Sequence, residues 1–215
     1  MPAIGITGGI STGKTTFCHF LKDLIPSARF FDADQAARSL TAVDPGVRKE
    51  IEDIFGNDLY SQEGNLNRAE LRAIILSSEA KRRALEQILH PRIRSQWSAE
   101  ARRYRDSPDF FFADIPLLYE TGGETLCDRV VVVACSPDVQ LQRLLARRST
   151  GGGVDATASR LNESEAIEMI RAQMSMDEKI RLADHVVWNN DGQTLLEEQT
   201  RDLVRLWAAT KWTVK

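Results

Sequence analysis

The chain has 215 residues, of which 42% are hydrophobic, so it can bury the core of one α/β domain that carries insertions. Its formal net charge of -3 provides no overall positive field to attract nucleic acid or an anionic membrane. No apolar run is long enough for a membrane helix, and Cys18, Cys127 and Cys135 form no CxxC pair, so we expect buried thiols in a cytoplasmic protein.

The first elements predict a strand, a glycine-rich loop and a helix. Residues 3–7 form a short apolar run, and helical spacing extends over residues 14–24, before Pro26. A second apolar run, at residues 28–31, leads into Asp32-Ala33-Asp34. Because parallel strands deliver their carboxyl ends to the ligand-binding edge of a sheet, we expect these acids to lie at that edge.

The middle of the chain predicts a helical insertion followed by two strands. Residues 43–105 show helical spacing with no strand between, and Pro91 is expected to begin a further helix. Apolar runs at residues 110–113 and 129–134 predict strands buried on both faces. Strands that alternate with helices predict an α/β fold in which a mostly parallel sheet is covered by helices on both faces.

The last third predicts two helices around a glycine-rich segment, then a strand and a helix. Ser136-Pro137 is a cap and first-turn proline for a helix that ends near Arg147-Arg148. The glycines at residues 151–153 break regular structure before a helix over residues 163–174, which indicates a mobile lid. A strand at residues 185–188 and a helix at 193–209 complete the sheet domain.

The segment from Gly8 to Thr15, GGISTGKT, matches the P-loop pattern GxxxxGK followed by Ser or Thr. It lies between a predicted strand and a predicted helix, as the pattern requires. Its backbone N–H groups would surround phosphate oxygens, Lys14 would bring positive charge to the β- and γ-phosphates, and the Thr15 hydroxyl would ligate Mg²⁺. The loop therefore predicts an ATP and Mg²⁺ site.

Two carboxylates are candidates for chemistry beside this loop. Asp34 could orient the acceptor hydroxyl and take its proton, or it could only cap the helix that follows, and the residues alone do not decide between these roles. Asp114 follows an apolar strand in the manner of a Walker B acid, which predicts a second Mg²⁺ ligand. A turn residue at the strand end is the alternative for Asp114.

Basic and amide side chains provide further candidates. Arg143 and Arg147 precede the lid, where a guanidinium could meet the transferring phosphoryl group, whereas Arg148 is better explained by complementing a helix C-terminus. Asn189 follows the last strand and could contact an adenine or form a plain turn. A lone histidine such as His90 is more often structural than catalytic.

An ordered set of motifs resembles the dephospho-coenzyme A kinase family along nearly the whole chain. The set comprises the P-loop, Asp32-Ala33-Asp34, Phe55-Gly56, Arg68, His90-Pro91, Pro116-Leu117-Leu118-Tyr119-Glu120, Gln173 and Ala183-Asp184 to Asn189. The family usually has Gly-Ser where Ser11-Thr12 stand, and its lid is usually shorter than the segment from Ser149 to Leu161.

The resemblance implies an ATP- and Mg²⁺-dependent transfer to the ribose 3′-hydroxyl of dephospho-coenzyme A. It implies a nucleotide core at residues 1–42, 108–148 and 183–215, a helical acceptor domain at 43–107 and a lid at 149–182. Asp34, Lys14 and Arg147 would be catalytic, and Thr15 and Asp114 would hold the metal. The nucleotide would contact Gly9, Ile10, Ser11, Thr12, Gly13, Lys14, Thr15, Thr16, Arg143, Gln173 and Asn189. The acceptor would contact Asp34, Arg68, His90, Leu117 and Glu120.

Three other functions are alternatives to this one. A GTPase is disfavoured because no NKxD motif occurs and the single DxxG string, Asp53 to Gly56, ends a predicted helix. A kinase for another small molecule shares the P-loop but not the HP and PLLYE motifs. A regulator without turnover is at odds with Lys14, Thr15 and Asp34. We expect a monomer or weak homo-oligomer that binds neither nucleic acid nor membrane.

Overall fold

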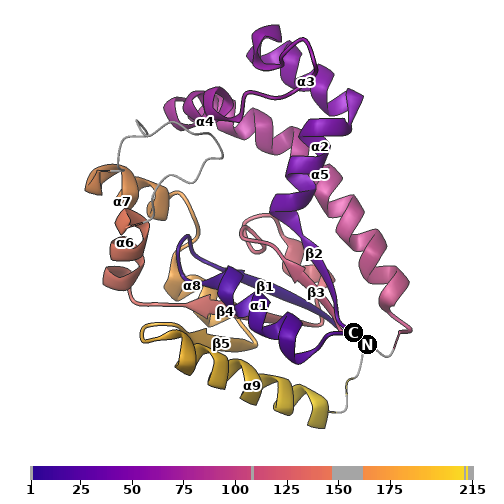
Figure 1. Cartoon of the computed structure of the whole chain (residues 1–215), viewed down its shortest axis with the longest axis vertical. Coiled ribbons are helices and arrows are strands. Elements are labelled where there is room, and N and C mark those ends of the chain that lie inside the picture. The colour runs from indigo at the N-terminus through magenta and orange to yellow at the C-terminus, as the bar shows by residue number, and fades with distance from the viewer. Residues whose placement is uncertain (1, 108, 147–161, 211, 213–215) are drawn as a thin grey trace. The chain divides into compact units, whose positions relative to one another are not determined.

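The computed structural model describes residues 2–107, 109–146, 162–210 and 212 (Figure 1). By compactness the chain divides into two units, one made of Met1–Phe31 with Ala101–Lys215 and the other of Asp32–Glu100. The sequence predicted a helical domain at residues 43–107, whereas the second compact unit also includes the helix that follows the second strand. The larger unit is called the sheet unit below, and Asp32–Glu100 the helical unit.

The sheet unit is built on five strands in the order β2-β3-β1-β4-β5. Strand β1 runs parallel to β3 and to β4, and β4 runs parallel to β5. The parallel α/β sheet predicted from the alternation of strands and helices is thereby confirmed. The strands are β1 (Ala3–Gly8), β2 (Arg29–Asp32), β3 (Phe111–Asp114), β4 (Arg129–Ala134) and β5 (His185–Trp188).

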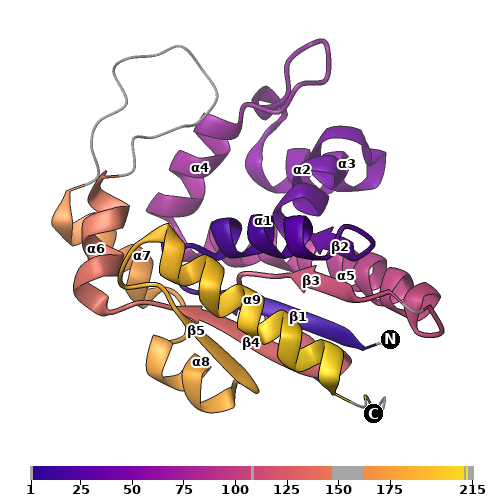
Figure 2. The same ribbon diagram turned by 60° about the horizontal axis from the view of Figure 1, so that its bottom comes forward.

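Helices α1 (Lys14–Leu24) and α9 (Gln193–Ala209) pack side by side on one face of this sheet (Figure 2). Alternation along the strands puts one set of side chains into the core between them. That core includes Ile4, Ile6, Phe17, Leu21, Val131, Val133, Leu196 and Trp207. On the opposite face a Cβ at Gly5 would lie 2.7 Å from both Leu118 and Cys127, so a larger residue there would displace these side chains.

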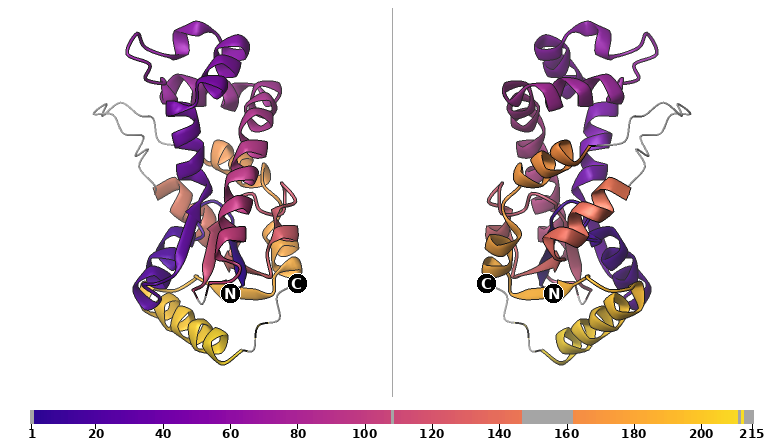
Figure 3. Two further views of the ribbon diagram at one scale, coloured as in Figure 1. Left: turned by 90° about the vertical axis from the view of Figure 1, so that its right-hand side faces the viewer. Right: turned by 90° about the vertical axis from the view of Figure 1, so that its left-hand side faces the viewer.

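The helical unit contains α2 (Ala33–Val43), α3 (Pro45–Phe55), the 3-10 turn η1 (Asn57–Leu59) and α4 (Arg68–Ser77) (Figure 3). It also contains most of α5 (Glu79–Tyr104). Its own apolar core brings these elements together. The buried members are Leu40, Val47, Ile51, Leu59, Tyr60, Leu71, Ile88 and Leu89. The helical insertion predicted from the spacing of apolar residues is present.

The prediction that Pro91 begins a helix is wrong, because α5 runs through it. An interior proline removes one backbone hydrogen bond and typically costs about 3 kcal/mol. Neighbouring residues of the same helix provide compensating contacts: Ile88 and Leu89 are buried, and Arg92 donates to the Ile88 carbonyl (2.7 Å) and to Glu50 (2.6 Å). Packing therefore outweighs the local preference for a helix start, and His90 lies in the helix interior.

The 3-10 turn η2 (Gly123–Leu126) precedes β4 in the sheet unit. Among the described residues, three short helices lie between β4 and β5. Helix α6 (Pro137–Ala146) begins after Ser136, whose hydroxyl accepts from the Val139 N–H, as predicted. The helix predicted over residues 163–174 is present as α7 (Glu163–Arg171) and ends three residues early, and a further helix that was not predicted, α8 (Met176–Leu182), follows it. The second begins at a capping box formed by Ser175 and Glu178, which separates the two. Arg147, Arg148 and the first part of the predicted lid, residues 149–161 of 149–182, lie outside the described residues.

Candidate active site

The glycine-rich loop between β1 and α1 is closed by contacts within itself. Gly13 is the N-cap of α1 with φ 96°, a left-handed conformation that glycine adopts without a Cβ penalty. The Thr12 hydroxyl donates to the Gly9 carbonyl at 3.0 Å. These contacts curl residues 9–13 in front of the first turn of α1, where the helix dipole favours a negative charge.

Ser11 is the one described non-glycine residue with positive φ, at 61°. Its hydroxyl is buried and has no hydrogen-bond partner among the described residues. The family resemblance placed a glycine at this position, and the left-handed backbone is the physical reason for that preference. An unpartnered buried hydroxyl at a phosphate-binding loop fits a nucleotide, whose phosphate oxygens are strong acceptors.

Three side-chain amides hold the loop from outside. The Ile10 N–H donates to Gln173 Oε1 and the Ile10 carbonyl accepts from Gln140 Nε2, each at 2.9 Å. Asn189 Nδ2 donates to the Thr12 carbonyl at 2.8 Å. Gln140 lies on α6, Gln173 follows α7, and Asn189 follows β5. The predicted site residues Gln173 and Asn189 thus meet the loop through its backbone.

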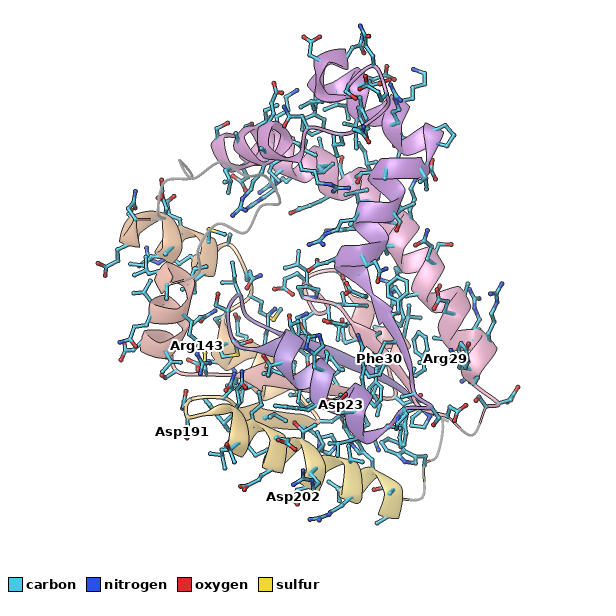
Figure 4. All side chains as sticks on the ribbon, viewed as in Figure 1. Asp23, Arg29, Phe30, Arg143, Asp191 and Asp202 are labelled. Carbon is cyan, nitrogen blue, oxygen red and sulfur yellow. The ribbon has the colours of Figure 1, made fainter. Side chains whose placement is uncertain are left out.

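Arg143, labelled in Figure 4, extends from α6 toward the end of β5. Its Nη1 donates to the Asn189 carbonyl at 2.7 Å, so this arginine supports the residue that in turn holds the P-loop. Burial raises the pKa of the neighbouring Cys135 thiol, and the Arg143 charge opposes that rise.

Lys14 and Asp114 form an ion pair beside the loop, with Nζ in contact with Oδ1 and with side chains only 13% and 14% exposed. Asp114 ends β3, as predicted for a Walker B acid. Its second oxygen accepts from the Cys18 thiol at 3.5 Å. Burial and the Asp114 charge raise the pKa of Cys18 above the ordinary thiol value, so the thiol stays protonated and donates. Thr15 is exposed in the first turn of α1.

The oxygen groups of Thr15 and Asp114 fit Mg²⁺, which prefers hard oxygen ligands and retains waters and substrate phosphates. The parts of the chain that the structure describes contain no cluster of three or more His, Cys, Asp or Glu side chains that could hold a metal alone. A metal here would therefore depend on the phosphates of the nucleotide for most of its ligands.

The PLLYE segment, residues 116–120, follows β3 directly. Leu118 is fully buried, and Leu117 is half-buried and accepts a hydrogen bond from the Thr121 hydroxyl at 2.7 Å. Glu120 Oε1 accepts from the Met174 N–H and contacts Lys179 Nζ, each at 2.9 Å. The segment is thereby tied to the junction of α7 and α8.

The other predicted acceptor residues, Asp34, Arg68 and His90, belong to the helical unit. Asp32 is the N-cap of α2 and accepts from the Gln35 N–H at 2.9 Å, whereas Asp34 lies in the first turn. The capping role considered for Asp34 is therefore performed by Asp32. Arg68 begins α4 and donates to the Arg38 carbonyl at 3.2 Å.

Two residues at the site were not predicted from the sequence. Gln140 is 4% exposed and binds the loop backbone, and Lys179 is fully buried below the loop. Neither position carries a recognisable motif, because the Gln140 contact joins residues 130 positions apart and the Lys179 contact with Pro116 joins residues 63 positions apart. The pattern Ser175-x-x-Glu178 could have predicted the start of α8 and so placed Lys179 on a helix.

A parallel sheet whose first strand leads through this loop into a helix, with the loop lysine beside a strand-end aspartate, defines a P-loop kinase. Among the described residues no helix has the length and apolar character needed to cross a membrane.

Comparison with known proteins identifies the family. The sequence profile described as Dephospho-CoA kinase matches residues 2–195. A Listeria monocytogenes dephospho-CoA kinase is 34% identical over 210 residues, covering 97% of this chain and 98% of the relative. The chain belongs to the dephospho-CoA kinase family. It is an ATP-dependent kinase that phosphorylates dephospho-CoA in the final step of coenzyme A biosynthesis.

Solved structures agree on the fold. A Thermus thermophilus protein superposes with a TM-score of 0.74 at 27% identity, over 98% of both chains. A dephospho-CoA kinase from Campylobacter jejuni superposes with a TM-score of 0.67 at 22% identity, over 94% of this chain and 95% of that one. The predicted P-loop kinase fold is thus confirmed over nearly the whole chain.

Proposed function

We propose that the chain transfers the γ-phosphoryl group of ATP to the ribose 3′-hydroxyl of dephospho-CoA. The observation that carries this proposal is the pairing of Lys14 with Asp114 beside a P-loop held closed by amide side chains. The acceptor oxygen forms a bond to the γ-phosphorus while the bond to the β,γ-bridging oxygen breaks, which releases ADP. The proton of the acceptor hydroxyl passes to a carboxylate.

On the nucleotide side, the backbone N–H groups of the loop and the Lys14 ammonium bind the phosphates. The nucleotide set comprises Gly9, Ile10, Ser11, Thr12, Gly13, Lys14, Thr15, Thr16, Arg143, Gln173 and Asn189. When ATP binds, Lys14 moves from Asp114 to the phosphates, since a triphosphate with a dianionic terminal phosphate is the stronger partner. Thr15 and Asp114 would hold Mg²⁺, which would supply positive charge opposite the phosphoryl oxygens. Arg147, which precedes the lid in the sequence, adds positive charge.

On the acceptor side, Asp34 orients the 3′-hydroxyl and takes its proton. Asp32 caps α2, and Asp34 lies in the first turn of the same helix. Arg68, His90, Leu117 and Glu120 form the remaining acceptor contacts. Arg68, at the start of α4, provides a guanidinium suited to an anionic pyrophosphate.

The finer organisation follows the same assignment. The core comprises residues 1–42, 108–148 and 183–215, the acceptor domain 43–107 and the lid 149–182. The protein acts in the cytoplasm as a monomer or weak homo-oligomer, without nucleic acid or membrane partners, in keeping with its net charge of -3.

The test is an ADP-release assay with MgATP and with dephospho-CoA, adenosine, AMP, pantetheine or water as the acceptor. We expect ADP release that depends on dephospho-CoA, and a product whose phosphate is on the 3′-hydroxyl by nuclear magnetic resonance. Addition of EDTA should abolish turnover, and addition of excess Mg²⁺ should then restore it. Phosphorylation at another hydroxyl, or turnover with EDTA present, would contradict the proposal.

A further inference from the structure

Lys179, on α8, is a fully buried cation below the P-loop, with 0% of its side chain exposed. Its ammonium lies 2.9 Å from Glu120 Oε1, 3.0 Å from the Pro116 carbonyl and 3.4 Å from the Gly8 carbonyl. An ammonium has three protons to donate, so each proton has an acceptor. The charge is therefore both paired and fully hydrogen-bonded.

Such an arrangement needs an explanation other than stability. Removing an ammonium from water is costly, and replacing a buried ion pair by apolar side chains of similar volume is often neutral or stabilising. Breaking the pair by removal of one partner is, in contrast, strongly unfavourable. A buried pair of this kind specifies the relative position of the segments that it joins.

The acceptors of Lys179 belong to two functional segments. Gly8 is the last residue of β1 and the first residue of the P-loop pattern, whereas Pro116 and Glu120 begin and end the PLLYE segment. The Pro116 carbonyl also accepts from the buried Thr7 hydroxyl at 2.9 Å. Lys179 thus ties the base of the nucleotide loop to the segment that the proposed function places on the acceptor side.

We propose that Lys179 is a positioning residue that fixes the PLLYE segment against the base of the P-loop, so that acceptor and ATP are aligned. The inference rests on the proposed function, because that function assigns Leu117 and Glu120 to the acceptor. Alignment errors of about 1 Å can lower a rate by about a hundredfold. The P-loop itself keeps its amide supports from Gln140, Gln173 and Asn189 when Lys179 is replaced, so ATP binding depends on it less.

The test replaces Lys179 and separates acceptor alignment from ATP binding. We expect Lys179→Met to lower kcat/KM for dephospho-CoA at least about tenfold, while the Kd for MgATP changes less than about threefold. Lys179→Arg, which retains the charge and the donors, should recover part of that loss. Arg205→Met is the matched control: it removes an exposed cation paired with Asp202 on α9 (Figure 4), and it should leave both constants unchanged.

The outcomes separate this proposal from the proposed function. If the wild-type chain releases no ADP with dephospho-CoA, both fail together. If the wild type is active but folded Lys179→Met has unchanged kcat/KM and only a lower melting temperature, Lys179 is merely structural and the inference is overturned. An equal loss of ATP affinity would also overturn it. If Lys179→Met does not fold, the same two constants are measured for Lys179→Gln, which keeps amide donors for the two carbonyls.

Discussion

Replacing Ser11 by glycine should stabilise the protein in the absence of nucleotide. Ser11 has φ 61°, and its buried hydroxyl lacks a partner among the described residues. A left-handed backbone costs an L-residue about 1–2 kcal/mol, and a buried unsatisfied hydroxyl costs about 1–3 kcal/mol. Glycine offsets about 0.4–1 kcal/mol of this gain, because it increases the entropy of the unfolded chain. The net gain expected for Ser11→Gly is about 1–4.5 kcal/mol.

Ser11→Ala separates the two contributions, since it removes the hydroxyl but keeps the Cβ in a left-handed backbone. We expect the free energy of unfolding to rise in the order Ser, Ala, Gly, with glycine above alanine by about 0.5–1 kcal/mol. Urea denaturation with equal m-values for all three proteins measures this order. Glycine no more stable than alanine would refute the argument from backbone strain, and alanine no more stable than serine would refute the argument from the hydroxyl.

Three further substitutions test the proposed roles. Asp34→Asn should lower kcat at least about a hundredfold with nearly unchanged ATP affinity. The control Asp32→Asn, which keeps a good N-cap, should have a kcat near that of the wild type. Equal rates in the two variants would remove Asp34 from catalysis. Lys14→Ala should weaken MgATP binding in a titration and also lower kcat, and a normal rate would discredit the P-loop assignment. Gly13→Ala should reduce ATP affinity at least about tenfold, because φ is 96° and the new Cβ would lie 2.0 Å from Asn189 Nδ2. Unchanged affinity would show that the loop adapts to the added Cβ.

Much of the fold was predictable because its signals are local. The strands β1, β3 and β4 are apolar runs that are mostly buried, and α1 and α9 begin and end at the residues that helical spacing indicates. Pro91 was misassigned because its local preference for a first turn is outweighed by the burial of Ile88 and Leu89, which depends on contacts with distant residues. Helix α8 was missed although its capping box is visible in the sequence.

The site was predictable only in part. Lys14 and Asp114 follow from the strand–loop–helix pattern and from a strand-end acid, and they do meet. The roles of Gln140 and Lys179 could not be predicted, because a glutamine or lysine on a helix is usually solvated and nothing local marks these two as buried. Asp32 and Asp34 could be distinguished only by the hydrogen bond from the Gln35 N–H, which depends on backbone geometry.

The hydrogen bond from Asn189 to the Thr12 carbonyl has a consequence for how the protein is made. It joins residues 177 positions apart, and Asn189 also donates its N–H to the Ala134 carbonyl at 2.7 Å. Synthesis proceeds from the N-terminus, so the loop is translated near the beginning, whereas the amide that holds it emerges near the end. A nascent chain released before β5 would carry the complete P-loop sequence without its support, and we expect such a fragment to bind ATP weakly. Nucleotide binding during synthesis would thus report that the sheet has closed around β5.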